Sequence, residues 1–184
     1  MYRYLKLGQG PQYTLSFFSA LSDYCLSERS LKLNKVIHAQ LIKLGFNVYT
    51  YLGNRCLDLY SKFGEVSDIL KVFDDISYKN STSWNICLKG LIRSGHLEKA
   101  CYLFDEMPVR DVVSWNTMIS GYSSHGFGNQ AFQIFLEMQN IGTRSSVFTY
   151  TIIMSLVSSP CQGKQIHGRL IRSGMDFSNL DIKN

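Results

Sequence analysis

The sequence predicts an all-α fold, a right-handed α-solenoid of about five helix–turn–helix repeats. The first observation is that the tripeptide Ser-Trp-Asn occurs at 83–85 and again, 31 residues later, at 114–116. The second is that Phe-Asp-Asp-Ile at 73–76, Phe-Asp-Glu-Met at 104–107 and Phe-Leu-Glu-Met at 135–138 follow at the same spacing. A period of about 31–35 residues is typical of helical arrays whose repeats bury their apolar faces against their neighbours.

The repeat boundaries follow from placing the Asn of each Trp-Asn at the fifth position of a repeat. An N-terminal segment then precedes five complete repeats and the start of a sixth. These parts are 1–14, 15–49, 50–80, 81–111, 112–146, 147–179 and 180–184. Positions seven and eleven, which did not set the register, are apolar in every complete repeat, and this agreement supports the division.

Each repeat is expected to form two helices, as 81–111 illustrates. A first helix over about 83–93 has apolar residues at i, i+3, i+4 and i+7. Gly95 follows it and is suited to the left-handed backbone that ends many helices. A second helix over about 97–107 ends before Pro108.

Small and aromatic residues of the repeats are expected in the core. Ala100 and Ala131 share one repeat position, where a small side chain lets two helices approach closely. Trp84 and Trp115 share another, and we expect them to pack between repeats rather than to stack on nucleic acid.

The repeat at 147–179 departs from the pattern. Lys-Val-Ile-His at 35–38 matches Lys-Gln-Ile-His at 164–167, but the spacing is three residues shorter than the repeat lengths predict. The deletion lies around 158–161, where Pro160 occupies the expected turn between the two helices.

Composition sets broad limits on function. The chain of 184 residues is 45% hydrophobic and has a formal net charge of +5, which is compatible with a polyanionic partner. No apolar run is long enough to span a membrane, so no membrane partner is expected. The segment 1–14 carries Arg3 and Lys6 and no acidic residue, a weak indication of organelle targeting.

Cysteine and histidine spacing argues against a metal centre. The five cysteines include no Cys-x-x-Cys pair, so neither a zinc site nor a disulfide framework is predicted, and a reducing compartment is indicated. Cys56 and Cys87 hold the same repeat position and are expected to be small buried hydrophobes. His38 and His167 also recur at one position, and packing is the favoured role for both. We expect no metal, no other cofactor and no small-molecule substrate.

These residues resemble a known family. Val-Val-Ser-Trp-Asn-Thr-Met-Ile-Ser-Gly-Tyr at 112–122, followed by Ala131 and 135–138, resembles the pentatricopeptide repeat (PPR). The alternation of lengths is similar to the plant subclass that mixes long and short repeats: 163–174 resembles its long repeat and 54–64 its short one. Because the chain stops in the first turn of a repeat, we expect a truncated member that lacks C-terminal extension domains.

The resemblance implies a partner and a set of binding residues. The family binds single-stranded RNA with one base per repeat. Position five and the last residue of a repeat would read the base, and the position-two side chains of adjacent repeats would sandwich it. The base-reading residues would be Asn54, Asn80, Asn85, Asp111, Asn116, Ser146, Thr151 and Asn179, and the sandwiching residues Tyr51, Thr82, Val113 and Phe148. In the first repeat the corresponding residues are Ser19, Tyr49 and Ser16.

The resemblance also implies base preferences. Asn85 with Asp111 would favour uracil. Asn54 with Asn80 and Asn116 with Ser146 would favour pyrimidines, cytosine more than uracil. Thr151 with Asn179 would lean to adenine, whereas Ser19 with Tyr49 departs from the family's pattern and receives no base. The alternative for any single Asn is a helix cap or a surface residue.

The chain itself is not expected to be an enzyme. His-Leu-Glu at 96–98 matches half of the zinc-deaminase motif, but no Pro-Cys-x-x-Cys follows, so we interpret the match as coincidental. The expected role is a non-catalytic specificity factor in C-to-U editing or other organellar RNA processing, with an editing enzyme or accessory protein acting in trans. The mitochondrion is the expected location and the chloroplast the alternative. A protein-binding scaffold and a relic without specific binding remain the competing hypotheses.

Overall fold

The structure is a computed structural model that describes residues 11–45, 49–156 and 168, with side chains from residue 16 onward. Every regular element in these ranges is an α-helix, from α1 to α9, which confirms the prediction of an all-α fold. The chain divides at residues 110 and 111 into two compact parts, called here the N-terminal and C-terminal modules, and each is described by itself.

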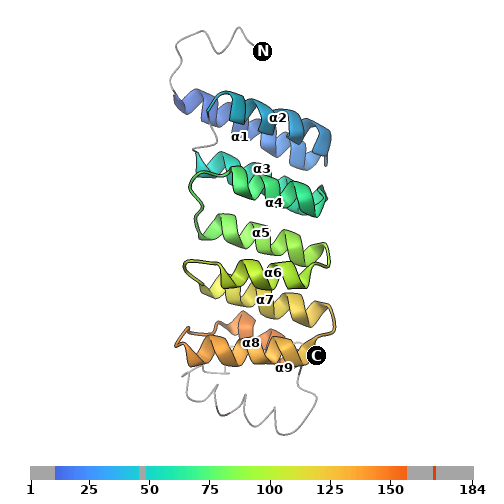
Figure 1. Ribbon diagram of the computed structural model, residues 1–184, viewed down its shortest axis with the longest axis vertical. Coiled ribbons are helices and arrows are strands. Elements are labelled where there is room, and N and C mark those ends of the chain that lie inside the picture. The colour runs from blue at the N-terminus through green and yellow to red at the C-terminus, as the bar shows by residue number, and fades with distance from the viewer. Residues whose placement is uncertain (1–10, 46–48, 157–167, 169–184) are drawn as a thin grey trace. The chain divides into compact units, whose positions relative to one another are not determined.

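In its described part, the N-terminal module contains three pairs of helices (Figure 1). They are α1 (Pro11–Ser27) and α2 (Leu31–Lys43), α3 (Thr50–Phe63) and α4 (Val66–Asp75), and α5 (Ser81–Arg93) and α6 (Leu97–Asp105). The first helix of the middle pair, α3, packs against α1 and α5, the first helices of the neighbouring pairs. The first helices of successive repeats therefore lie side by side, which places their equivalent residues in a row.

The C-terminal module contains α7 (Val112–Ser124), α8 (Gly128–Asn140) and α9 (Val147–Ser155) in its described part. Helix α7 packs against both α8 and α9. The core has fully buried side chains from all three helices, including Trp115, Met118, Phe135 and Ile153. Such burial is the main stabilising term in a fold of this size.

The two helices of 81–111 lie within two residues of the bounds expected for them. Helix α5 begins at Ser81 rather than about 83, because Asn80 and Ser83 form a capping box that starts the helix earlier. Helix α6 ends at Asp105, two residues before the expected end. Helix α1 begins at Pro11, ahead of the expected repeat boundary at 15, and proline is well suited to the first helical position.

Equivalent glycines in the turn between the two helices of a repeat differ in conformation. Gly95 and Gly126 have φ of +76° and +81°, as expected of a left-handed helix end. Gly64 has φ of −94°, because only two residues separate α3 from α4 where three separate the later pairs. Glycine is still required there, since a Cβ atom would lie 2.8 Å from the Tyr60 carbonyl oxygen.

The predicted core positions are largely confirmed. Cys56, Cys87, Ala100 and Ala131 have no exposed surface, and burial raises the pKa of the Cys56 and Cys87 thiols to about 12. These cysteines are therefore neutral packing residues, as predicted.

The two tryptophans of the repeated Ser-Trp-Asn are not equivalent. Trp115 is completely buried, whereas Trp84 is half-buried and packs edge-to-face against Phe73, with ring centroids 4.9 Å apart. Both therefore belong to the packing of the fold, as predicted.

None of the helices in the described part of the chain has the length and apolar character needed to cross a bilayer.

Candidate functional site

The position-five residues lie on the first helix of each repeat. Asn54 in α3 and Asn85 in α5 are only 8% and 7% exposed, Asn116 in α7 is half-buried, and Thr151 in α9 is exposed. Ser19 in α1 is half-buried. Each lies several residues inside its helix, so none of them is a helix cap.

The last residues of the repeats are the caps instead. Asn80, Asp111 and Ser146 are the N-caps of α5, α7 and α9, and each side chain accepts a hydrogen bond from a backbone N–H three residues on. Such caps satisfy N–H groups that the helix leaves without partners. Tyr49, the N-cap of α3, makes no side-chain capping bond. Asn80 is thus a helix cap, the alternative given above for any single Asn, and Asp111 and Ser146 are caps as well.

In the N-terminal module, the structure brings Asn54 and Asn80 together. The Nδ2 of Asn54 donates to Oδ1 of Asn80 at 3.2 Å. The same Asn80 oxygen accepts from the backbone N–H of Ser83 at 3.0 Å and from the Ser83 hydroxyl at 3.1 Å. The buried Oδ1 of Asn54 has no hydrogen-bond partner among the described residues. We call Asn54, Asn80 and Ser83 the Asn54 slot.

In the C-terminal module, Asn116 and Ser146 also meet. The Nδ2 of Asn116 donates to the Ser146 hydroxyl oxygen at 3.2 Å. The carbonyl oxygen of Asn116 accepts from the Thr149 hydroxyl at 2.6 Å, so both ends of this amide are held by the protein. We call Asn116, Ser146 and Thr149 the Asn116 slot. Thr149 had not been selected from the sequence, although its place as third residue of the next helix could have indicated a capping-box partner.

The other residues expected to read bases include Asn85 in the N-terminal module and Asp111 and Thr151 in the C-terminal module. Asp111 accepts from the Ser114 backbone N–H at 2.8 Å. The Thr151 hydroxyl donates to the Val147 carbonyl oxygen at 3.0 Å, a bond within its own helix. Asn179 lies outside the described residues.

The position-two side chains all point away from the core. Tyr51, Val113 and Phe148 are 56%, 49% and 58% exposed, and Thr82 and Ser16 are also exposed. Three of these five side chains are apolar or aromatic surfaces open to solvent. They are suited to stacking on planar ligands, which adds affinity with little sequence preference.

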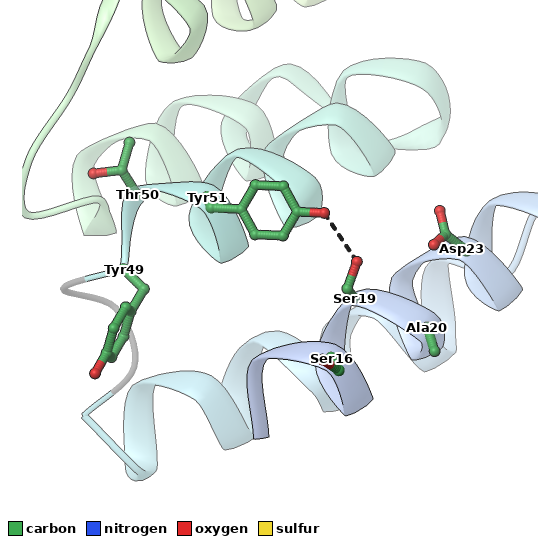
Figure 2. A pocket seen from close by; sticks show the side chains of 7 residues that line it. All are labelled: Ser16, Ser19, Ala20, Asp23, Tyr49, Thr50 and Tyr51. Atoms are coloured by element: carbon green, nitrogen blue, oxygen red, sulfur yellow. Dashed lines mark hydrogen bonds between the residues drawn. The ribbon is translucent and has the colours of Figure 1, made fainter. Parts of the chain in front are cut away.

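A shallow hollow of about 760 Å³ lies between α1 and the start of α3 (Figure 2). It is lined by Ser16, Ser19, Ala20, Asp23, Tyr49, Thr50 and Tyr51. The Tyr51 phenol points toward α1, where its oxygen lies 2.9 Å from the Ser19 hydroxyl oxygen. Asp23 forms an ion pair with Arg55. In this first repeat, position five is thus bonded to the position-two residue of the next repeat, a contact that the sequence did not predict.

His38 lies apart from these slots and is a packing residue, as predicted. Its ring meets that of Tyr60 edge-to-face, with centroids 5.9 Å apart, and its Nε2 lies 3.7 Å from a carboxylate oxygen of Asp75. Burial lowers the pKa of His38 below its ordinary value, although the Asp75 carboxylate opposes this shift. His167, its counterpart, lies outside the described residues.

Two family descriptions match the chain: the PPR repeat family over residues 110–158 and the PPR repeat over residues 82–112. A mitochondrial pentatricopeptide repeat-containing protein of Arabidopsis thaliana is 55% identical over 168 residues, which are 91% of this chain and 26% of that protein. A second Arabidopsis thaliana relative, a putative pentatricopeptide repeat-containing protein that is also named mitochondrial, is 31% identical over 170 residues. These are 91% of this chain and 22% of that protein. This chain therefore spans about a quarter of the length of these curated relatives.

Solved structures share the fold. The crystal structure of the pentatricopeptide repeat protein PPR10 from maize matches with a TM-score of 0.72 at 21% identity, over 86% of this chain and 24% of that one. The structure of PPR10 in complex with an 18-nt psaJ RNA element matches with a TM-score of 0.68 at 20% identity, over 86% of this chain and 25% of that one. At these identities the likeness extends to the helical-repeat fold alone.

Proposed function

Since this chain belongs to the pentatricopeptide repeat family, we propose that it binds single-stranded RNA, with one base read per repeat. The observation that carries this proposal is the recurrence of one arrangement in both modules. In each, a position-five amide donates at 3.2 Å to the residue that caps the next repeat's first helix. An amide has both donors and an acceptor to offer, as recognition of a base edge requires.

The two amides keep hydrogen-bonding capacity for a base. Each Nδ2 has two N–H groups, of which one is used in the contact with the cap residue. The Asn54 carbonyl oxygen has no partner among the described residues, and leaving a buried acceptor without a bond costs about 1–3 kcal/mol. A base donor that reaches this oxygen would remove that penalty. Because the oxygen is buried, a neighbouring side chain must move as the base enters.

The exposed position-two residues supply the stacking surfaces. Tyr51 would contact the base read by Asn54, and Val113 and Phe148 would lie on either side of the base read by Asn116. In maize PPR10, a protein of known structure with this fold, the ligand is an RNA element of 18 nucleotides. By the family's pattern, the pairs Asn54–Asn80 and Asn116–Ser146 would select pyrimidines, with cytosine preferred, and Asn85 with Asp111 would select uracil.

The biological setting that we propose is mitochondrial RNA processing. Two of the relatives compared above are named mitochondrial, which supports that compartment for this chain. Within it, the chain would act as a non-catalytic specificity factor, in C-to-U editing or related processing, with the catalytic protein supplied in trans. From the alternation of its repeat lengths, we also propose that it belongs to the mixed-length subclass.

The number of repeats limits the expected affinity. If each good base contact is worth about 1–3 kcal/mol, three or four readable repeats give roughly micromolar binding. A three- or four-base site recurs often in any transcript, so selection of one transcript requires further repeats or a partner.

The proposal is tested by selection from a random single-stranded RNA pool with the purified chain, with double-stranded DNA as a control. We expect enrichment of a short pyrimidine-rich motif and no comparable binding to the duplex. Weak, salt-sensitive binding to both nucleic acids without any motif would contradict base reading, because backbone charge alone produces that behaviour.

A further inference from the structure

Thr149 is a buried residue in the Asn116 slot that belongs to none of the three positions expected to touch RNA. It is the third residue of α9, has no exposed surface, and donates its hydroxyl proton to Oδ1 of Asn116 at 2.6 Å. We propose that Thr149 is a positioning residue that fixes the Asn116 amide and so sets the choice between cytosine and uracil in this repeat. The inference rests on the proposed function and concerns its specificity.

The capping box of α9 explains why the Thr149 proton points at Asn116. The Thr149 hydroxyl oxygen accepts from the Ser146 backbone N–H at 3.0 Å, and the Ser146 hydroxyl oxygen accepts from the Thr149 backbone N–H at 3.2 Å. Both caps thus use hydroxyl lone pairs. The two hydroxyl oxygens also lie 3.0 Å apart, and since the Thr149 proton goes to Asn116, Ser146 is the donor in this contact. A hydroxyl has a single proton to donate. Thr149 donates its proton to the Asn116 oxygen in the short bond.

Two opposite contacts then determine which way the amide faces. Its oxygen accepts from Thr149 at 2.6 Å and its nitrogen donates to Ser146 at 3.2 Å. One N–H and one oxygen lone pair remain, in a fixed order along the edge of the side chain. Cytosine and uracil present donor and acceptor in opposite orders on their Watson–Crick edges. A fixed amide therefore distinguishes the two bases, whereas an amide free to turn over reads both.

The Asn54 slot provides a control within the same chain. Ser83 holds the position equivalent to Thr149 and also completes a capping box, at the start of α5. Its hydroxyl donates to Asn80 Oδ1 at 3.1 Å instead of reaching the position-five amide. The Asn54 oxygen accordingly has no partner among the described residues. Completing the capping box and bonding the position-five oxygen are thus separate features. Of the two slots, the Asn116 slot combines them.

The experiment compares base preference in three variants of the full chain. Asn116→Ala first identifies, by selection from the random pool, the nucleotide whose preference this slot sets. RNAs that differ only in cytosine or uracil at that nucleotide are then titrated. We expect the unaltered chain to prefer one pyrimidine by about tenfold, the value of a well-oriented pair of hydrogen bonds, and Thr149→Val to reduce the ratio to about twofold or less. Thr149→Ser restores the hydroxyl and should restore the preference.

The matched control is Ser83→Ala. It removes the equivalent capping hydroxyl without touching the Asn116 amide, so the melting temperature should fall about as much as in Thr149→Val while the preference at this nucleotide is unchanged. A second readout needs no variant: the buried Thr149 hydroxyl proton should be visible by NMR and show a nuclear Overhauser effect to the Asn116 side chain.

The outcomes separate this inference from the function on which it rests. If the unaltered chain selects RNA and Thr149→Val retains the full preference, or if the hydroxyl proton shows no contact with Asn116, the role of Thr149 is wrong and RNA reading stands. If Ser83→Ala lowers the preference equally, then the loss of a capping hydroxyl, rather than of the Thr149–Asn116 bond, explains the lower preference. If the unaltered chain selects no single-stranded RNA, the proposed function fails and this inference fails with it.

Discussion

The Asn54 slot and the Asn116 slot share one arrangement of residues but differ in how many hydrogen bonds fix the position-five amide. In both, Nδ2 donates at 3.2 Å to the residue that caps the first helix of the following repeat. In the Asn116 slot, the amide oxygen is also bonded, to Thr149 at 2.6 Å, and the side chain is half-buried. In the Asn54 slot, the oxygen is buried without a partner among the described residues, and the side chain is 8% exposed.

A repeat motif therefore does not by itself determine the hydrogen bonding of its position-five residue. The difference arises from the third residue of the following repeat, Ser83 in one case and Thr149 in the other. Both complete a capping box, but the Thr hydroxyl turns to the amide and the Ser hydroxyl to the cap. A β-branched side chain such as Thr has fewer χ1 choices than Ser, which favours a single fixed network.

The largest expected effect concerns the residue before each amide, which is Trp115 in one slot and Gly53 in the other. Trp115→Ala should lower the free energy of unfolding by about 3–5 kcal/mol, because it empties a fully buried site. Urea denaturation followed by circular dichroism measures the change. Trp84→Ala is the matched control, with a smaller loss expected because Trp84 is half-buried. Equal losses would show that burial does not distinguish the two positions.

The amides themselves should differ in their contribution to stability. Asn116→Ala removes two hydrogen bonds and should destabilise the chain by about 1–2 kcal/mol. Asn54→Ala removes one bond and also a buried acceptor without a partner among the described residues, so its net cost should lie within about 1 kcal/mol of zero. Thermal unfolding of the two variants side by side tests this difference. A larger loss for Asn54→Ala than for Asn116→Ala would contradict the contrast between the slots.

Substituting the cap residue of the Asn54 slot should change base specificity with little change in stability. Asn80→Asp keeps an acceptor oxygen for the Ser83 N–H and the Asn54 amide, so helix α5 should remain capped. By the family's pattern, the base preference of this repeat should move from cytosine to uracil. Asn80→Ala is the control, and it should cost about 1 kcal/mol through loss of the cap. RNA selection and thermal unfolding of both variants measure the two effects; an unchanged preference in Asn80→Asp would argue that Asn80 is a cap alone.

The smallest effect concerns acid sensitivity in the module that contains the Asn54 slot. Burial holds the pKa of His38 below 6.5, near the Asp75 carboxylate and the Lys71 ammonium group. The unfolded chain therefore binds a proton first, so the stability present above pH 6.5 should decline as the pH falls toward the folded-state pKa. Unfolding measured between pH 7.5 and 5.5 tests the decline. His38→Gln should show a flatter profile, and an equally steep profile in that variant would assign the effect to other groups.

Much of the fold could be predicted because apolar residues recur at fixed positions of each repeat. Trp115, Cys56 and Ala131 are buried as their spacing indicated. The different conformation of Gly64 could not be foreseen, because it depends on the length of the turn rather than on the glycine itself. Nor could the sequence show that Tyr51 bonds to Ser19, since the two residues lie in different repeats and meet only when α1 packs against α3.

The resemblance to the repeat family implied Asn54 and Asn116, together with Asn80 and Ser146, as base-reading residues, and that role stays a prediction. The structure brings each pair together within its own module. The bonding of Thr149 to the Asn116 oxygen depends on the orientation of a hydroxyl in a capping box, which residue type alone does not determine.

The measurement that tests the central claim most directly is a titration of RNA into the isotopically labelled chain, followed through the side-chain amide NMR signals of Asn54 and Asn116. With a single-stranded RNA containing the selected motif, both pairs of signals should shift at saturation, and duplex DNA should leave them in place. If RNA binds while both amides stay unperturbed and only lysine and arginine signals move, then the slots do not read bases and the account is wrong.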